Sequence, residues 1–301
     1  MDKIKLAYKN ILVTGGNGFL GQNLVTALNE YHTNVYILDT VKKNVNNEFI
    51  CDINDINKIH NIIKEIHPDI IFHLAANLTR DRNFDNHDEI IKVNYSGTVN
   101  LLKALQNVDY ENFIFTSSSE VYGLNKAPFK ETMCPIPTSP YSMSKYFAEI
   151  AIRTFSNIYK KNYTILRLFN FYGYNMPDTF FISQLLNSLK NNSVFKMTAG
   201  KQKRDFVHID DVINAMLIVA SNTEISKNEI FNICTGKSIT IKELALYCKS
   251  YLNSECRIEF GALKYRENEI WDMTGDNTKI INKLGFKIQH NLNNFLKSYN
   301  Q

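Results

Sequence analysis

A glycine-rich turn near the start of the chain limits the possible folds more than any other feature of the sequence. An apolar run, Asn10–Thr14, leads into Thr14-Gly-Gly-Asn-Gly-Phe-Leu-Gly21, and apolar residues at helical spacing follow. In such a turn Gly15 permits the sharp change of direction, Gly18 lets the backbone approach a phosphate, and Gly21 lets the helix pack on the strand. The helix N-terminus then offers free N–H groups to an anion. The pattern predicts a strand–turn–helix unit that binds the pyrophosphate of a dinucleotide.

The rest of the first half alternates between apolar runs and helical patterns. Four further segments fit this alternation: apolar runs over 35–38, 69–76 and 112–117, and a helical pattern over 56–66. The run over 69–76 lacks polar alternation, which is typical of a strand buried on both faces. Repeated strand–helix–strand units predict an α/β fold built on a doubly wound parallel sheet.

The second half is less regular after its first helix and strand. A helix is expected from Pro140 toward Lys161, followed by a strand over 163–168. Farther on, helical stretches near 179–190 and 241–252 are mixed with short apolar runs. We therefore expect a smaller C-terminal α/β lobe built on the far end of the sheet. The predicted division assigns 1–172 and about 206–235 to the dinucleotide-binding domain, and about 173–205 and 236–301 to the lobe.

Composition and charge argue against several classes of protein. The 34 Lys and Arg residues against 30 Asp and Glu give a net charge of only +4, which does not indicate a nucleic-acid partner. No stretch of 18 apolar residues occurs, so the sequence predicts neither a membrane span nor a secretory signal. The five cysteines form no C-x-x-C motif, which is typical of a cytoplasmic protein with reduced thiols. The seven histidines include no H-x-x-x-H pair, so we expect no metal site.

Asp39 and Asp52 are the acidic residues placed to contact the nucleotide. Asp39 closes the second strand, where a carboxylate accepts hydrogen bonds from both ribose hydroxyls and repels a 2′-phosphate. NAD is therefore favoured over NADP, although Lys42 and Lys43 follow closely. The alternative is that Asp39 is only a turn residue at the strand end. Asp52 could reach the adenine edge or serve as a helix N-cap, and the two roles do not exclude each other.

A tyrosine and a lysine in one predicted helix form the candidate catalytic pair. Tyr141 and Lys145 are four residues apart, which places both side chains on one helix face. Tyr122 and Tyr163 have a basic residue at the same spacing, but the first precedes a loop and the second opens a strand. A nearby ammonium lowers the pKa of a phenol from its usual value of about 10. Tyr141 can then act as a base toward a sugar hydroxyl that Ser118, at the end of the fourth strand, orients.

These motifs, in this order, resemble the extended short-chain dehydrogenase/reductase group, and within it the NAD-dependent nucleotide-sugar epimerases and dehydratases. The resemblance covers nearly the whole chain. It implies a Rossmann domain, a small C-terminal substrate lobe, often a homodimer, and a role in making precursors of cell-surface polysaccharides. Besides the glycine turn and Asp39, it rests on His73–Ala76, Asn94, Ser117–Gly123, Tyr141–Lys145, Arg167–Gly173, Arg204–Asp211 and Arg266–Glu269.

The same resemblance implies roles for individual positions. Ser118, Tyr141 and Lys145 are the implied catalytic residues. The implied NAD contacts are Gly15, Gly18, Phe19, Leu20, Gly21, Asp39, Asp52, Ile53, Leu74, Ala75, Ala76, Asn94, Tyr141 and Lys145. The implied contacts to a nucleotide-diphosphate sugar are Ser118, Ser119, Asn170, Arg204 and Arg266. Two guanidinium groups suit the paired oxygens of a diphosphate. For each arginine a surface ion pair is the alternative, and Asp205 adjoins Arg204.

Glu120 separates the possible reactions. In 4,6-dehydratases that resemble this chain, Thr or Ser is followed by an Asp-Glu pair that starts elimination, whereas Ser118-Ser119-Glu120 retains only the glutamate. Some similar dehydratases and decarboxylases also carry Ser before the Glu, so this departure does not exclude elimination. We predict an NAD-dependent enzyme that transfers hydride at C4 of a nucleotide-linked sugar, with Tyr141 as acid and base. The net reaction would be 4-epimerisation or 4-dehydrogenation/4-keto reduction. The alternatives are a 4,6-dehydratase or decarboxylase that uses Glu120, and a sensor that binds NAD without turnover.

The segment 79–90 is unusually charged for its place after the third strand. It is expected to face the nicotinamide region, so Arg80 or Arg82 could contact substrate. A solvated loop is the alternative.

Overall fold

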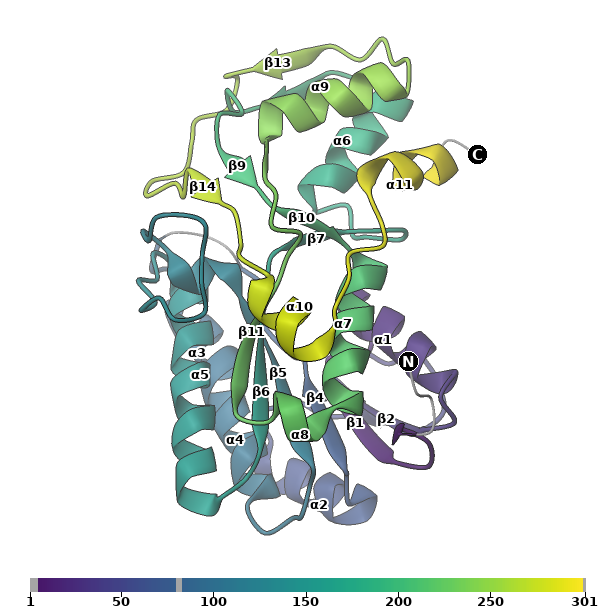
Figure 1. The fold of residues 1–301 in the computed structure, drawn as a ribbon, viewed down its shortest axis with the longest axis vertical. Helices are drawn as coiled ribbons and strands as arrows, with labels where there is room; N and C mark the ends of the chain where they lie inside the picture. Colours follow the sequence, from purple (N-terminus) through teal and green to yellow (C-terminus); the bar gives the residue numbers. More distant parts are fainter. Residues whose placement is uncertain (1–4, 80–82, 300–301) are drawn as a thin grey trace.

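A parallel sheet of seven strands forms the centre of the structure, a computed structural model that describes residues 5–79 and 83–299. The strand order is β11-β6-β5-β4-β1-β2-β3 (Figure 1). Because β1 pairs with both β2 and β4, the chain builds the sheet outward in two directions from β1. This confirms the predicted doubly wound α/β fold. The strands are β1 (Asn10–Thr14), β2 (Asn34–Asp39), β3 (Glu48–Ile50), β4 (Ile70–His73), β5 (Asn112–Ser118), β6 (Tyr163–Leu168) and β11 (Glu229–Ile233).

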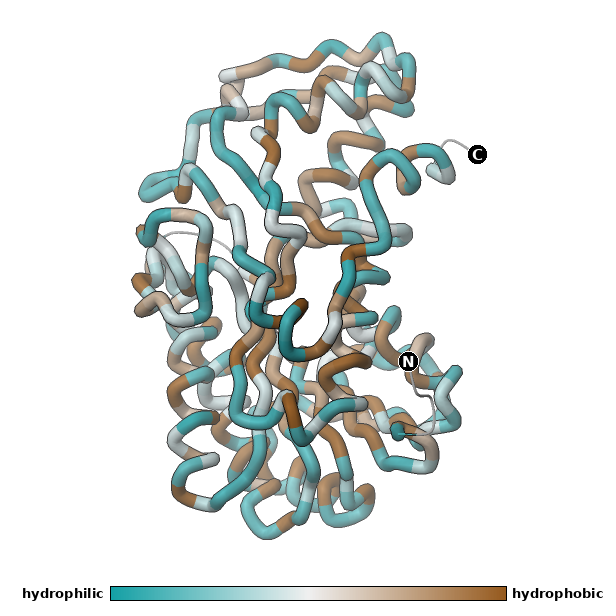
Figure 2. The backbone as a smooth tube through the Cα atoms, viewed as in Figure 1, coloured by the Kyte–Doolittle hydropathy of each residue, from teal (hydrophilic) through white to brown (hydrophobic). Residues whose placement is uncertain are grey.

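Alternate strand residues pack against helices on opposite faces of the sheet. Ile11 and Val13 of β1 belong to one hydrophobic cluster, whereas Leu12 between them belongs to another. Burial on both faces explains why the strands are apolar throughout, and Figure 2 shows apolar stretches gathered along the central strands. The first face is covered by α1 (Phe19–Asn29), α7 (Ile209–Ser221) and α10 (Thr278–Leu284), and the second by α2 (Ile56–Ile66), α4 (Gly97–Leu105) and α5 (Pro140–Tyr159).

A smaller lobe is stacked on one end of the sheet domain (Figure 1). Tyr172, Leu185 and Leu244 are among the buried residues of its separate hydrophobic cluster. Ile280 and Phe286 fall in the range predicted for the lobe, but they pack in the cluster with α1 and α7. The lobe contains α6 (Phe181–Lys190), β8 (Phe195–Met197), β9 (Lys203–Arg204), β12 (Ile239–Thr240), α9 (Ile241–Tyr251), β13 (Ile258–Phe260), β14 (Asp272–Met273) and α11 (Leu292–Tyr299).

Short elements that sequence periodicity does not predict connect these parts. A π-helical turn joins α3 to α4, and a 3₁₀ turn directly follows β5. β7 and β10 pair in parallel, with Asn170 opposite Phe206. The short elements are α3 (His87–Ile91), η2 (Lys92–Ser96), η3 (Ser119–Tyr122), β7 (Asn170–Tyr172), β10 (Phe206–His208) and α8 (Thr223–Ser226).

A buried ion pair fixes α5 against the sheet. Arg167 of β6 donates from Nη2 to Glu149 Oε2 at 2.7 Å and from Nε to Oε1 at 3.0 Å, and both side chains are almost fully buried. Ser117 Oγ of β5 donates to the same carboxylate at 2.5 Å, and the Tyr122 ring lies 4.7 Å from the guanidinium carbon. Glu149 is one helical turn after Lys145. The ion pair therefore holds the part of α5 that carries the candidate catalytic lysine.

Replacing Glu149 with Gln leaves Arg167 buried without its counter-ion. Breaking a buried pair in this way costs on the order of 3–5 kcal/mol, so we expect the free energy of unfolding in urea to fall by that amount. The matched control is Glu224→Gln, which breaks the exposed pair between Glu224 and Lys227 and should cost about 0.5 kcal/mol or less. Equal losses in the two variants would contradict the role assigned to the buried pair.

Candidate active site

The glycine-rich turn between β1 and α1 is tightly packed at Gly21 but leaves space at Gly18. A Cβ atom on Gly21 would lie 2.3 Å from the carbonyl oxygen of Gly15, so strand and helix touch there. Among the described residues, a Cβ atom on Gly18 would meet only that oxygen, at 3.4 Å. Gly18 is the N-cap of α1, and Phe19 and Leu20 form the first turn, whose N–H groups lack intrahelical partners. The turn therefore fits a pyrophosphate group.

Asp39 lies beside this turn at the end of β2. Its Oδ2 accepts the backbone N–H of Asn17 at 2.9 Å, and its Oδ1 accepts that of Val41 at 3.0 Å. An ionised carboxylate has about four acceptor positions, so capacity remains for ribose hydroxyls. Glu48 adds a second carboxylate, which accepts the Asn17 side-chain amide at 2.6 Å and the backbone N–H of Lys43 at 2.8 Å. Two carboxylates beside the turn disfavour a 2′-phosphate, in agreement with the expected preference for NAD.

Asp52 does not cap the helix that follows it. Its Oδ1 accepts the backbone N–H and the side-chain amide of Asn54, at 2.9 and 3.0 Å. The N-cap of α2 is Asp55, whose side chain accepts an N–H three residues later. The capping role considered for Asp52 is therefore wrong, and its contact with adenine stays a prediction. Ile53 packs against Gly97 at the start of α4, where a Cβ atom would lie 2.4 Å from Ile53 Cγ2.

A chain of hydrogen bonds through His73 joins β1, β4 and α4. The backbone N–H of Ala75 donates to Thr14 Oγ1, whose hydroxyl contacts His73 Nδ1 at 2.7 Å. His73 Nε2 lies 2.8 Å from Thr98 Oγ1, and that hydroxyl donates to the carbonyl of Asn94 at 2.6 Å. Because the Thr98 proton is already used, Nε2 must be the donor to Thr98 and Nδ1 the acceptor from Thr14. Burial lowers the pKa of His73 to about 3, so the ring stays neutral.

Asn94 connects the loop after β4 to α5. Its Oδ1 accepts the N–H of Asn77 at 2.7 Å, and its Nδ2 donates to the carbonyl of Asn77 at 3.0 Å and to Ser144 Oγ at 2.9 Å. Ser144 in turn donates to the carbonyl of Tyr141 at 2.8 Å. These contacts give Asn94 a positioning role, and its direct contact with NAD stays a prediction. The loop that it holds follows β4 and begins with Leu74, Ala75 and Ala76.

Tyr141 and Ser118 lie where α5 begins and β5 ends. Ser139 caps α5 and Pro140 opens it, which puts Tyr141 in the first turn. Ser118 is the last residue of β5, and its Oγ accepts the backbone N–H of Glu120 at 3.1 Å. Tyr141 and Ser118 are only 4% and 8% exposed. The phenol and the hydroxyl are therefore held at one end of the sheet by the boundaries of two rigid elements.

Lys145 is buried against β5, one turn of α5 after Tyr141. Its Nζ donates to the carbonyl oxygen of Thr116 at 2.9 Å and lies 4.8 Å from the centre of the Phe115 ring. Burial lowers the pKa of Lys145 from 10.5 to about 7, and the nearby Glu149 carboxylate acts in the opposite direction. The pKa of Lys145 therefore lies close to neutral pH. In its charged form, Lys145 can favour ionisation of the Tyr141 phenol one helical turn away.

Arg204 is held in place by the segment that carries Glu269. Its Nη2 donates to Glu269 Oε1 at 2.5 Å and its Nη1 to the carbonyl of Ile270 at 2.7 Å. Asp205 is fully buried and instead accepts the N–H and the hydroxyl of Thr235, at 2.9 and 2.7 Å. Arg204 therefore does form an ion pair, with Glu269 in place of the adjacent Asp205. The sequence motif contained Glu269, but nothing in the pattern identified it as the partner.

Two further charged groups lie near Arg204, and Asn170 of β7 pairs with Phe206, two residues after Arg204. Burial lowers the pKa of Arg204, and the carboxylate of Glu269 opposes this effect. The charge of Glu120 also opposes it, whereas the charge of Arg266 adds to it. Arg266 itself is exposed. Among the described residues, the buried Nδ2 of Asn170 has no hydrogen-bond partner. Two guanidinium groups and a buried amide donor with spare capacity fit an anionic ligand such as a diphosphate.

Glu120 and its neighbours occupy the 3₁₀ turn after β5. Ser119 is 3% exposed and Glu120 is half-buried, so the turn packs into the protein directly after Ser118. The charge of Glu120 reaches Arg204 across the site. Arg80 and Arg82, the other expected substrate contacts, lie outside the described residues, and their role stays a prediction.

Comparison with known proteins identifies the family. The family model for the NAD dependent epimerase/dehydratase family matches residues 11–234. The chain belongs to this family. NAD is the cofactor of the family, and the glycine turn with Asp39 provides a site that fits it. Family members are enzymes, so the sensor alternative no longer applies.

Several similar proteins carry the names of enzymes that act on nucleotide sugars. A Methanocaldococcus jannaschii protein with the provisional name UDP-glucose 4-epimerase is 33% identical, over 95% of this chain and 96% of its own. The human dTDP-D-glucose 4,6-dehydratase is 31% identical, over 79% of this chain and 72% of its own. The crystal structure of UDP-glucose 4-epimerase with UDP-glucose from Thermotoga maritima superposes with a TM-score of 0.89, at 29% identity, over 96% of both chains. The protein is thus a nucleotide-sugar epimerase/dehydratase family enzyme.

Alanine at Gly18 and at Gly21 should separate cofactor binding from packing. Gly21→Ala places a methyl group against Gly15 and should destabilise the protein by about 1–3 kcal/mol, measured without NAD. Gly18 has a φ of −73°, which alanine adopts without strain, so Gly18→Ala should keep its stability and bind NAD at least about tenfold more weakly. Wild-type NAD affinity in Gly18→Ala would exclude this turn as the pyrophosphate site.

Lys145 should make stability depend on pH in the NAD-free protein. Its pKa is about 7 when folded against 10.5 ordinarily, so the unfolded chain binds more protons between these values. Stability must therefore rise with pH across this window, and the burial cost is greatest below pH 7. Lys145→Met should flatten the curve of unfolding free energy against pH, whereas Lys103→Met, at an exposed position on α4, should not. An unchanged slope in Lys145→Met would contradict the lowered pKa.

Proposed function

We propose that this enzyme oxidises and reduces C4 of a sugar carried on a nucleoside diphosphate, as a 4-epimerase or as a 4-dehydrogenase/4-keto reductase. The observation that carries the proposal is the burial of Tyr141 and Lys145 on one face of α5, against the strand that ends in Ser118. A phenol, an ammonium and a hydroxyl in this arrangement suit the removal and return of one hydroxyl proton.

Each of the three side chains has a distinct task in this proposal. NAD supplies the hydride acceptor and donor when it is bound. Tyr141 takes the proton from the C4 hydroxyl during oxidation and returns it during reduction. Lys145 favours the phenolate through its charge, and Glu149 one turn later favours the charged form of Lys145. Ser118 Oγ holds the reacting hydroxyl in the orientation that Tyr141 requires.

Arg204, Arg266 and Asn170 would hold the diphosphate group of the nucleotide sugar. Arg204 is oriented beforehand by Glu269 and by the carbonyl of Ile270, whereas Arg266 is exposed and able to close on a ligand. The spare amide N–H of Asn170 supplies a further donor. The likeness to the Thermotoga maritima enzyme, whose structure contains UDP-glucose, supports a nucleotide sugar as the ligand class.

A 4,6-dehydratase or decarboxylase that uses Glu120 is the second candidate. It is favoured by the position of Glu120 in the turn after Ser118, half-buried and within electrostatic reach of Arg204. Two observations favour the first candidate. Ser119 stands where many of the similar dehydratases carry an acid. The relative named as an epimerase matches 95% of this chain, whereas the human dehydratase matches 79% of it.

We propose further that a second copy of the chain covers α5. Phe147, Ile150 and Ile158 lie on this helix and are 39%, 43% and 64% exposed. Their spacing of three and eight residues puts them on one face, and Tyr95 of the π-helical turn packs edge-on against Phe147. An apolar helix face of this kind supports a homodimer.

The proposed setting of the reaction is the cytoplasm, in the supply of precursors for surface polysaccharides. All five cysteines are free thiols, which fits a reducing compartment. Across residues 5–79 and 83–299, no helix combines the length and apolar character needed to cross a membrane. The chemistry that precedes this step must activate a sugar as its nucleotide diphosphate.

Two substitutions test the proposal on a panel of nucleotide sugars, with products identified by mass spectrometry and NMR. Tyr141→Phe should reduce turnover by at least about a hundredfold, because it removes the acid and base, and should leave NAD affinity nearly unchanged. Tyr159→Phe, at the exposed end of the same helix, is the control and should retain turnover. Glu120→Gln should keep most of its turnover, whereas loss of product with hydride transfer retained would favour the dehydratase candidate. Full activity in Tyr141→Phe would refute both candidates.

A further inference from the structure

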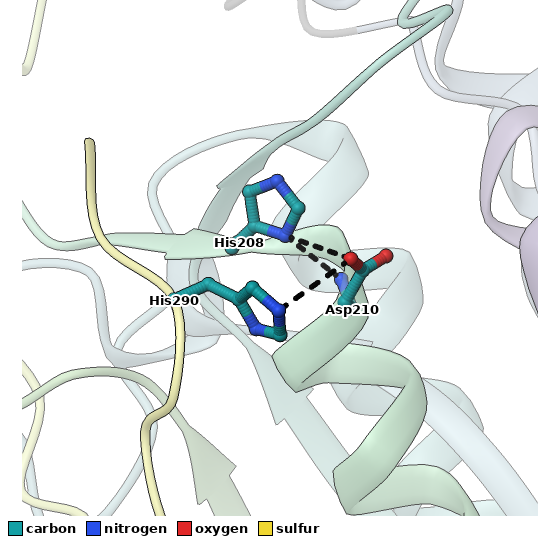
Figure 3. Close-up of side chains that lie close together, drawn as sticks. All are labelled: His208, Asp210 and His290. Carbon is teal, nitrogen blue, oxygen red and sulfur yellow. Dashed lines mark hydrogen bonds and ion pairs between the residues drawn. The ribbon is translucent and has the colours of Figure 1, made fainter. Parts of the chain in front are cut away.

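Two histidines and an aspartate that are distant in the sequence converge outside the proposed active site. His208 ends β10, Asp210 lies in the first turn of α7, and His290 lies in the segment before α11 (Figure 3). Asp210 Oδ2 is 3.5 Å from His208 Nδ1 and 3.7 Å from His290 Nε2. One candidate ligand atom from each residue lies within 4.8 Å of the other two. We propose that His208, Asp210 and His290 bind a divalent transition-metal ion.

The hydrogen bonds around His290 engage Nδ1 and leave Nε2 available to bind an ion. Its Nδ1 lies 3.0 Å from Asp211 Oδ1, so Nδ1 carries a proton. In the neutral ring, Nε2 then carries the lone pair that faces Asp210. A carboxylate that accepts the other ring N–H is the usual support of a metal-binding histidine. The same Asp211 accepts the backbone N–H groups of Gln289 and His290, each at 3.0 Å. The side chain of His290 is therefore oriented before any ion binds.

His208 contributes an unprotonated ring nitrogen close to Asp210 Oδ2. Its Nδ1 accepts the backbone N–H of Asp210 at 3.2 Å, which shows that this nitrogen is unprotonated. An ion would replace this long hydrogen bond. Asp210 is exposed, with 56% of its side chain accessible, so water can take over its N–H group. His208 is 4% exposed and rigid, whereas His290 has a partly exposed side chain that can adjust.

Charge and ligand type indicate which ion fits. Asp210 and Asp211 bring two carboxylates to one helix turn, and they offset the positive end of the α7 dipole. Two imidazole nitrogens and one carboxylate oxygen suit Zn²⁺, Co²⁺ or Ni²⁺ better than Mg²⁺ or Ca²⁺. Tetrahedral bonds of about 2.0–2.1 Å require ligand atoms roughly 3.3 Å apart. The two distances to Asp210 already approach this value, and a water molecule can complete the set.

The ion would add a further link between two parts of the chain that already contact each other, through hydrogen bonds to Asp211 and through the stacked rings of His208 and His290. Metal binding would fasten the segment before α11 to the start of α7. β10, which ends in His208, follows directly after Arg204 and Asp205. The proposed role is structural, so it does not depend on which reaction the enzyme catalyses. The lack of a short-range histidine pair in the sequence does not exclude a site assembled from residues 208 and 290.

Zn²⁺ titration of the full chain tests the proposal. The parent protein is Cys134→Ser, because an exposed thiol such as that of Cys134 is a competing ligand for Zn²⁺. After dialysis against a chelator, calorimetry should show one Zn²⁺ bound per chain, and thermal melts should shift upward with Zn²⁺. Asp210→Asn and His290→Gln should each weaken binding at least tenfold and remove the shift. His60→Gln, at an exposed position on α2, should behave as the parent.

Asp210→Asn is the decisive variant, because it should remove a metal ligand without disturbing the fold. The Asp210 side chain is solvent-exposed, and asparagine has nearly the same size. Circular dichroism and turnover of the variants establish that they are folded. Absence of saturable binding by the parent, or equal Zn²⁺ affinity in the parent and Asp210→Asn, would overturn the proposal.

Discussion

The hydrogen bond from Lys145 Nζ to the carbonyl oxygen of Thr116 places a cation inside the protein, and the rest of the site depends on it. Burial of an ammonium is costly, and it lowers the pKa of Lys145 to about 7. The fold limits this cost with the Glu149 carboxylate one helical turn away, which the buried guanidinium of Arg167 holds in place. The buried pair of Glu149 and Arg167 therefore does more than hold α5 against the sheet. Through Glu149 it also favours the charged form of Lys145, which acts on Tyr141.

Two further networks connect this centre to the cofactor and substrate regions. The hydrogen bonds through His73 and Asn94 run from β1 to the helix turn that contains Tyr141, so the expected floor of the NAD site and the catalytic helix share one rigid frame. On the lobe side, Asp205 ties the start of β10 to the end of β11, and Glu269 orients Arg204. Hydrogen bonds in the sheet domain and in the lobe therefore position the residues that are expected to bind and react.

Local patterns in the sequence were sufficient for much of this arrangement. The glycine turn, the apolar strands and the Pro140 start of α5 are short-range features, and each forms where periodicity and turn chemistry predict it. Contacts between distant segments were not predictable in the same way. Glu269 pairs with Arg204 because β14 lies beside β9. Asp55, and not Asp52, caps α2, because Asp55 directly precedes the first helical residue, Ile56. His208 and His290 meet because the segment before α11 is hydrogen-bonded to Asp211 in the first turn of α7.

Transfer of a label from C4 of the substrate tests the central claim most directly. The enzyme is incubated with nucleotide sugars deuterated at C4, and the products are followed by NMR while absorbance records NADH. The proposed chemistry predicts deuterium retained at C4 of an isomeric sugar, or deuterium transferred to NAD with formation of a 4-keto product. Deuterium found at C6 with loss of water, or a product unlabelled at C4 without NADH formation, would contradict it.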